Sequence, residues 1–218
     1  MRNKVIERVL TGKLIVIARG MAEEQILPMA EALHKGGVRM LEVTFLQDRP
    51  DSFSMTARSI AAIRKRFGED MYAGAGTVLT EEHLKLAEDA GAMYIISPST
   101  DPEIIKKTRE KNMVSIPGAL SASECVTAHN AGADFIKLFP AGCMGVDYFR
   151  EMRAPLSHVR FLGVAGITLD NIADYIKVGA VGFGIGRALA NIDLVEAGEF
   201  EKITSLAKQY VQAVAVTP

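Results

Sequence analysis

Short apolar runs alternate with longer amphipathic stretches along the whole chain. A run of a few Val, Ile and Leu residues is typical of a strand that is buried on both faces, and a 3.6-residue periodicity is typical of a helix that covers it. The alternation therefore indicates βα units that feed one parallel sheet. We predict strands at 14–19, 40–45, 71–75, 93–97, 114–116, 135–139, 160–164 and 181–184. The predicted helices follow them at about 22–35, 51–67, 80–90, 101–111, 121–131, 146–154, 168–178 and 198–214.

Residues typical of helix ends support this division. Thr80, Ser121 and Thr168 stand where predicted helices begin, and Ser121 is followed three residues later by Glu124, which is a capping-box pattern. Glycines stand between several helices and the next strand, where a left-handed C-cap favours a residue without a Cβ atom. These glycines are Gly36, Gly37, Gly91, Gly132 and Gly179.

Eight βα units in a chain of this length predict an α/β protein with a closed (β/α)8 barrel, the TIM-barrel fold. We expect a single domain over residues 1–218, with residues 1–10 as an extra helix that covers the N-terminal end of the barrel. An open, doubly wound sheet is the alternative, but no GxGxxG motif follows the first strand. In a barrel the active site lies at the carboxyl ends of the strands, so polar residues there are the candidates for function.

Two ionisable residues stand inside predicted buried strands, where such residues are uncommon. Glu42 lies in the second strand and Lys137 in the sixth. Side chains alternate between the faces of a strand, so Lys137 shares a face with Phe135 and Phe139. Strands two and six lie on opposite sides of an eight-stranded barrel, so both side chains can face one ligand in its mouth.

Such a pair can carry out imine chemistry. Burial between phenylalanines lowers the pKa of a lysine and frees its amine to attack a carbonyl group. A buried glutamate can then move the protons of imine formation and carbon–carbon cleavage. The alternative is a buried ion pair between Glu42 and Lys137 that only holds the barrel together.

Further candidates stand at other strand ends. Arg19 ends the first strand and can hold a carboxylate or phosphate, or form a salt bridge at the rim. The loops after the seventh and eighth strands contain Gly166, Gly186 and Arg187. Loops at these places often bind phosphate through exposed backbone N–H groups, and the alternative is tight turns with an exposed arginine.

Composition narrows the possible classes of protein. The chain has 25 Lys and Arg against 26 Asp and Glu, and 49% of its residues are hydrophobic, so it can bury a core and shows no basic excess for nucleic acid. No run approaches the roughly 18 apolar residues of a membrane span, and the first residues lack the apolar core of a signal peptide. Cys125 and Cys143 have no disulfide or zinc-site spacing. We expect a cytoplasmic protein with neither a nucleic-acid nor a membrane partner.

Several ordered motifs together resemble the 2-keto-3-deoxy-6-phosphogluconate / 4-hydroxy-2-oxoglutarate aldolases. The resemblance runs from about residue 5 to residue 214. It is carried by Leu41-Glu42-Val43-Thr44, Gly74-Ala75-Gly76-Thr77-Val78, Ile96-Ser97-Pro98 and Ile136-Lys137-Leu138-Phe139-Pro140-Ala141.

The resemblance implies a class I aldolase on a (β/α)8 barrel, without a metal or other cofactor, that forms a homotrimer. Its substrate would be a 2-keto-4-hydroxy acid, which is cleaved to pyruvate and an aldehyde. By the same resemblance, Lys137 would be the Schiff-base lysine and Glu42 the general acid/base. Thr77 and Pro98 would line the pyruvate end, and Phe139 would pack beside the imine. Arg19 would match the basic residue that closes the carboxylate site.

The chain departs from the family in the substrate pocket, at the carboxylate-binding position of residue 46 and in the loops expected at the far end of the substrate. Leu46 stands where some relatives have an arginine, Gly163-Val164-Ala165-Gly166 replaces Pro-Thr-Gly-Gly, and Arg187 replaces a phosphate-contacting serine. An unphosphorylated 2-keto-3-deoxy sugar acid is therefore an alternative substrate, and a non-catalytic keto-acid-binding barrel is an alternative function. A metal-dependent aldolase with Glu42 as a ligand is disfavoured, since no second carboxylate or histidine stands at a neighbouring strand end.

Overall fold

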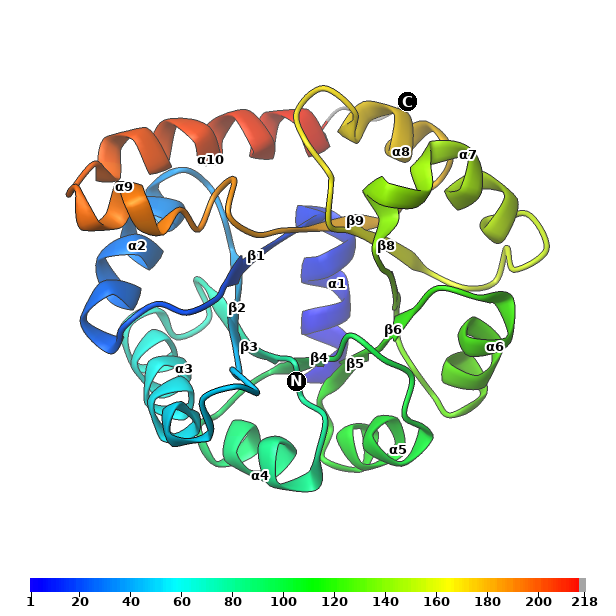
Figure 1. Cartoon of the computed structure of the whole chain (residues 1–218), viewed down its shortest axis with the longest axis horizontal. Helices are drawn as coiled ribbons and strands as arrows, with labels where there is room; N and C mark the ends of the chain where they lie inside the picture. The colour runs from blue at the N-terminus through cyan, green and yellow to red at the C-terminus, as the bar shows by residue number, and fades with distance from the viewer. Residues whose placement is uncertain (216–218) are drawn as a thin grey trace.

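The computed structural model describes residues 1–215, in which parallel strands form a ring surrounded by helices (Figure 1). The strands are β1 (Leu14–Ala18), β2 (Met40–Thr44), β3 (Tyr72–Gly76), β4 (Tyr94–Ile96), β5 (Val114–Ile116), β6 (Gly118–Ala119), β7 (Ile136–Leu138), β8 (Phe161–Val164) and β9 (Gly182–Ile185). The helices are α1 (Arg2–Gly12), α2 (Glu23–Lys35), α3 (Phe53–Phe67), α4 (Glu81–Asp89), α5 (Pro102–Glu110), α6 (Ala122–Asn130), α7 (Ala141–Arg153), α8 (Ile172–Lys177), α9 (Ile192–Glu196) and α10 (Phe200–Ala215).

The ring closes through residues 114–119. The strands pair in the order β5-β4-β3-β2-β1-β9-β8-β7-β6, so β5 and β6 stand at the two ends of that order. They are successive pieces of one chain segment, interrupted at Pro117, which has no N–H to donate. The carbonyl of Pro117 accepts a hydrogen bond from the Lys137 N–H, at 2.9 Å. The two pieces thus count as one strand of the barrel. The predicted (β/α)8 barrel is confirmed.

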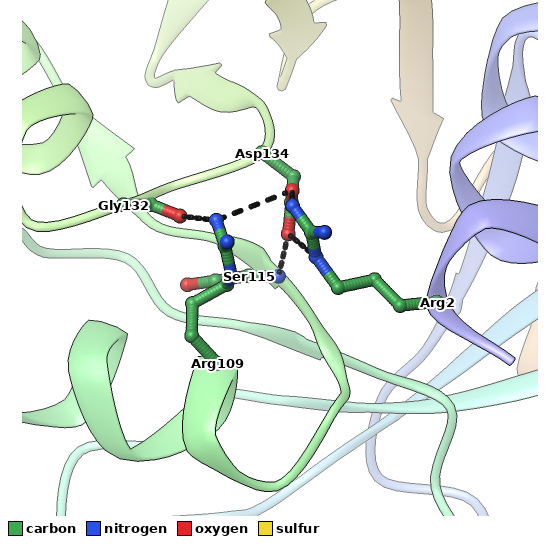
Figure 2. Close-up of polar contacts among 5 residues, drawn as sticks. All are labelled: Arg2, Arg109, Ser115, Gly132 and Asp134. Atoms are coloured by element: carbon green, nitrogen blue, oxygen red, sulfur yellow. Dashed lines mark hydrogen bonds and ion pairs between the residues drawn. The ribbon is translucent and has the colours of Figure 1, made fainter.

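Helix α1 covers the N-terminal end of the barrel, as predicted, and lies across the opening of the ring in Figure 1. Val5 and Val9 are buried against residues that begin the strands, such as Met40. The helix is also tied down at its first residue, because Arg2 forms an ion pair with Asp134, whose side chain is 2% exposed (Figure 2).

Apolar side chains separate into an inner and an outer cluster according to strand alternation. Ile136 and Leu138 of β7 pack in the outer cluster beneath the helices, whereas Phe135 packs in the inner cluster with Ile15 of β1. This division confirms the predicted period-two orientation of the strands. It also places Lys137, between Ile136 and Leu138, on the inner side of the barrel.

Several element boundaries differ from the predictions. The helix predicted at 146–154 begins at Ala141 and is kinked at Gly145, where φ is 83°. The helix predicted at 168–178 begins only at Ile172, because the side chain of Asn171 accepts a hydrogen bond from the Thr168 N–H and forms a turn. Pro50–Ser52 is a 3-10 turn before α3, and the five-residue α9 was not predicted.

The first strand ends at Ala18, so Arg19 follows it rather than closing it as predicted. Within residues 1–215, no helix combines the length and the apolar character that crossing a membrane requires.

Candidate active site

Glu42 and Lys137 lie on opposite sides of the barrel and line the same cavity. Strands β2 and β7 are separated by β1, β9 and β8 on one side, and by β3, β4 and the β5–β6 segment on the other. Apart from these two side chains the lining of the cavity is apolar, and its volume is about 10 Å³. Its other lining residues are Ile15, Ile17, Ile96, Ile116, Leu162, Val164 and Gly184. The two ionisable groups therefore line one small cavity that has room for about one water molecule.

Lys137 has an environment that favours its neutral amine. Its side chain is buried, and Nζ lies 4.7 Å from the ring centroid of Phe139. Burial lowers the pKa of Lys137 below its usual value, the charge of Glu42 opposes this effect, and the charge of Arg19 adds to it. A lysine with a lowered pKa has a larger fraction of neutral, nucleophilic amine at neutral pH.

Glu42 is 1% exposed and is held by one neighbour on its own strand. The hydroxyl of Thr44 donates a hydrogen bond to Oε1 of Glu42, at 3.2 Å. Burial raises the pKa of Glu42, and the nearby Lys137, the Thr44 hydrogen bond and Arg19 oppose the rise. A carboxyl group with a raised pKa can exchange protons near neutral pH, as general acid–base catalysis requires.

Arg19 and Thr77 meet at the rim of the barrel. The Arg19 guanidinium donates a hydrogen bond to the hydroxyl of Thr77 at 3.3 Å, and the side chain of Gln47 donates one to the carbonyl of Thr77 at 3.2 Å. Thr77 has a φ of 55°, an uncommon conformation for a residue with a side chain. Arg19 is exposed and lowers the pKa of both Glu42 and Lys137, so its charge reaches the cavity.

Pro98 is half-buried two residues after the end of β4, and its backbone touches Gly118 of β6. A Cβ atom at Gly118 would lie 2.4 Å from the carbonyl carbon of Pro98, so only glycine fits there. Phe139 is also half-buried and covers Lys137. The structure therefore brings both predicted apolar residues to the strand ends that surround the cavity.

The loop after β8 lies against the start of α7. The Gly142 N–H donates a hydrogen bond to the carbonyl of Ala165 at 2.8 Å, and a Cβ atom at Gly142 would lie 2.5 Å from the Cα of Gly166. The side chain of Asn171 donates to the carbonyl of Gly166 at 2.9 Å. This loop is thus fixed by glycine contacts within the protein.

The loop after β9 is more open. A Cβ atom at Gly186 would meet nothing within 4 Å. Arg187 has a side chain that is 76% exposed and forms an ion pair with Asp193, at 2.6 Å. The positive charge of Arg187 is therefore partly neutralised by the Asp193 carboxylate.

Sequence reasoning missed three features of the site. Tyr94 is fully buried beside Glu42, and the pattern that could have revealed it is the inward-facing position that it shares with Ile96 on β4. Gly76 gives space to the Glu42 carboxylate, a role that only the pairing of β2 with β3 reveals. The third is Gln47, whose side chain reaches the Thr77 carbonyl although the preceding residue, Leu46, is buried at the helix layer beside Met55.

Metal ligands are scarce in this part of the molecule. Among the described residues, no three His, Cys, Asp or Glu side chains gather in a way that could hold a metal ion. The ionisable groups that line the cavity are instead the amine of Lys137 and the carboxyl group of Glu42.

A buried amine and a carboxyl group thus line one apolar cavity inside a (β/α)8 barrel, the fold whose enzymes bind substrates at the carboxyl ends of the strands. A family model for KDPG and KHG aldolase matches residues 5–206. The chain belongs to this family and is a class I aldolase, a lyase of carbon–carbon bonds.

Individual relatives agree with the family. The chain is 34% identical over 214 residues to a 2-dehydro-3-deoxy-phosphogluconate aldolase of Treponema pallidum, covering 98% of this chain and 97% of the relative. A KDPG aldolase of Legionella pneumophila, solved with pyruvate captured as a covalent carbinolamine intermediate, superposes with a TM-score of 0.83 at 25% identity and covers 95% of this chain and 97% of its own. A protein cage designed by fusing symmetric oligomeric domains superposes with a TM-score of 0.80 at 30% identity, covering 92% of this chain and 71% of its own.

Proposed function

We propose that Lys137 forms an imine with the C2 carbonyl of a 2-keto-4-hydroxy acid, and that the enzyme cleaves this acid to pyruvate and an aldehyde. The observation that carries the proposal is the shared cavity of Glu42 and Lys137, in which the pKa of the lysine is lowered and that of the glutamate is raised. A structural ion pair would instead favour both charged forms.

The proposed reaction begins with attack of the neutral Lys137 amine on C2, which gives a carbinolamine that loses water to form a protonated imine. Glu42, through a water molecule, then takes the proton of the C4 hydroxyl. The C3–C4 bond breaks, its electron pair moves toward the imine nitrogen, and the aldehyde leaves. The resulting enamine takes a proton at C3, and water hydrolyses the imine to release pyruvate and the free lysine.

At the pyruvate end, Thr77 and Pro98 would line the site and Phe139 would pack against the imine. Arg19 would bind the substrate carboxylate. Its guanidinium already donates to Thr77, and its charge reaches both catalytic groups. Arg19 would therefore bind the substrate carboxylate and also help to lower the pKa of Lys137.

The far end of the substrate would lie near Gly166, Gly186 and Arg187. The family model and the named relatives point to 2-keto-3-deoxy-6-phosphogluconate and 4-hydroxy-2-oxoglutarate as substrates. The observation behind a second candidate, an unphosphorylated 2-keto-3-deoxy sugar acid, is that Arg187 already pairs with the Asp193 carboxylate.

We further propose one domain over residues 1–218 and a cytoplasmic homotrimer. Residues 216–218 lie outside the described part of the chain. The similarity to a cage built from symmetric oligomeric domains supports an oligomer, and the free thiols of Cys125 and Cys143 are typical of a reducing compartment.

The test is a retro-aldol assay that measures pyruvate release from phosphorylated and unphosphorylated six-carbon 2-keto-3-deoxy acids and from 4-hydroxy-2-oxoglutarate. We expect turnover with at least one of them, unchanged by a chelator and lost in Lys137→Met. Binding of these acids without any pyruvate release would support the non-catalytic barrel. Activity that chelator removes, or that Lys137→Met retains, would contradict the imine mechanism.

A further inference from the structure

Tyr94 carries a buried hydroxyl that no group in the structure satisfies. The residue is fully buried within the barrel, on β4. Among residues 1–215, the buried side-chain oxygens and nitrogens that lack a hydrogen-bond partner are the Tyr94 hydroxyl and Oε2 of Glu42. Leaving a buried polar group unsatisfied costs free energy, and phenylalanine would fill nearly the same volume without that cost. The hydroxyl therefore needs an explanation.

The strand register brings Tyr94 and Glu42 into one layer of the barrel. Glu42 of β2 lies beside Gly74 of β3, and Ala75 lies beside Ile95 of β4, so Gly74 also lies beside Tyr94. The aromatic ring of Tyr94 occupies the space over Gly74, where a Cβ atom would lie 2.5 Å from the Cζ atom of the ring. Because Cζ carries the hydroxyl, the ring extends from β4 across β3 toward the strand of Glu42.

Two glycines on the same face of β3 make this arrangement possible. Gly74 admits the Tyr94 ring, and Gly76 admits the Glu42 carboxylate. Any larger residue at either position would push these groups apart or out of the lumen. Burial and the charge of Glu42 raise the pKa of Tyr94 well above its usual value, so its hydroxyl keeps its proton and remains a donor.

We propose that Tyr94 is a positioning residue for Glu42, and that its O–H group donates a hydrogen bond to Oε2, directly or through one buried water, when the carboxylate is ionised. The inference rests on the proposed role of Glu42 as the acid/base. Thr44 already donates to Oε1, so both carboxylate oxygens would be held. The hydrogen bond would stabilise the ionised form that takes the C4 hydroxyl proton.

The test is the pH profile of kcat for retro-aldol cleavage by Tyr94→Phe, because Lys137 is already bonded to the substrate in the enzyme–substrate complex and the acid limb then reports Glu42. A hydrogen bond to the carboxylate lowers the pKa of Glu42, so its loss should move the acid limb of the profile to higher pH, by about one pH unit. Tyr72→Phe is the matched control, since Tyr72 is a buried, inward-facing tyrosine on β3 whose ring lies under Arg8. We expect its acid limb to stay in place. An unmoved limb in a folded Tyr94→Phe variant would overturn the inference, because a purely structural tyrosine would leave the pKa of Glu42 unchanged.

A second experiment does not depend on the variant folding. Global replacement of tyrosine by 3-fluorotyrosine keeps every ring and makes the phenol a stronger donor, so the acid limb should move to lower pH; an unmoved limb would overturn the inference. Reductive trapping of pyruvate on Lys137 in the unmodified enzyme separates the two claims. If trapping succeeds and neither substitution moves the limb, only the role of Tyr94 is wrong. If trapping fails, the proposed function fails, and the role of Tyr94 fails with it.

Discussion

The Glu42 carboxylate fills the space in which residue 76 would carry a side chain. A Cβ atom at Gly76 would lie 1.6 Å from Oε1 of Glu42. The two residues come from neighbouring strands, since Thr44 of β2 pairs with Gly76 of β3. A glycine without chemistry of its own therefore decides whether the carboxyl group can stay in the cavity.

Gly76→Ala should reduce turnover without unfolding the protein. The new methyl group would displace the Glu42 carboxylate, and losing an acid/base costs about 100-fold or more in kcat. Gly12→Ala is the control, because a Cβ atom there meets nothing within 4 Å and residue 12 ends α1, the helix at the opposite end of the barrel. Steady-state kinetics and a thermal melt on both variants check this, and full activity of a folded Gly76→Ala enzyme would contradict it.

Much of the site could be predicted from the sequence because of where charge interrupts apolar strands. Glu42 and Lys137 are each surrounded by residues that prefer burial, and strand alternation alone orients both toward the lumen. The Arg187–Asp193 pair could not be predicted, since Asp193 belongs to a five-residue helix whose pattern is too short to identify. Likewise the contact of Tyr94 with Gly74 depends on the register between β3 and β4, which no local pattern encodes.

Glu42→Gln should lower the pKa of Lys137 further. The negative charge of Glu42 opposes the lowering that burial causes, and the amide removes that charge. Imine formation needs the neutral amine, so the rate of pyruvate trapping plotted against pH should rise at a lower pH in Glu42→Gln than in the wild type. Trapping rates measured with borohydride from about pH 5 to 10 test the sign, and a midpoint that moves to higher pH would show that the two groups do not interact as described.

Asp134→Ala should destabilise the protein while leaving the chemistry intact. The side chain of Asp134 is buried, pairs with Arg2 of α1, lies 3.7 Å from Arg109 and accepts a hydrogen bond from the Ser115 N–H at 3.0 Å (Figure 2). Removing it leaves the Arg2 guanidinium and the Ser115 N–H without their acceptor, which should cost about 2–4 kcal/mol of unfolding free energy. Asp147→Ala breaks an exposed pair with Arg150 and should have no measurable effect. Urea unfolding checks both, and equal stability of the two variants would show that α1 is not anchored through Asp134.

Arg187→Ala separates the two candidate substrate classes. If Arg187 binds a phosphate, the variant should raise KM for a phosphorylated substrate by about tenfold and leave KM for an unphosphorylated one unchanged. Asp193→Asn frees Arg187 from its ion pair and should lower the same KM by about two- to threefold. If KM changes equally for both substrates, or if neither variant changes KM, Arg187 does not belong to the substrate site.

The central claim is that the amine of Lys137 forms the covalent bond to the substrate, and reductive trapping tests it most directly. The enzyme is incubated with pyruvate and borohydride, digested, and mapped by mass spectrometry. We predict that one reduced pyruvyl group is added on Lys137, and that Lys137→Met takes up none while keeping its fold. An unmodified Lys137 in folded, active enzyme, or labelling of another lysine in its place, would contradict the account.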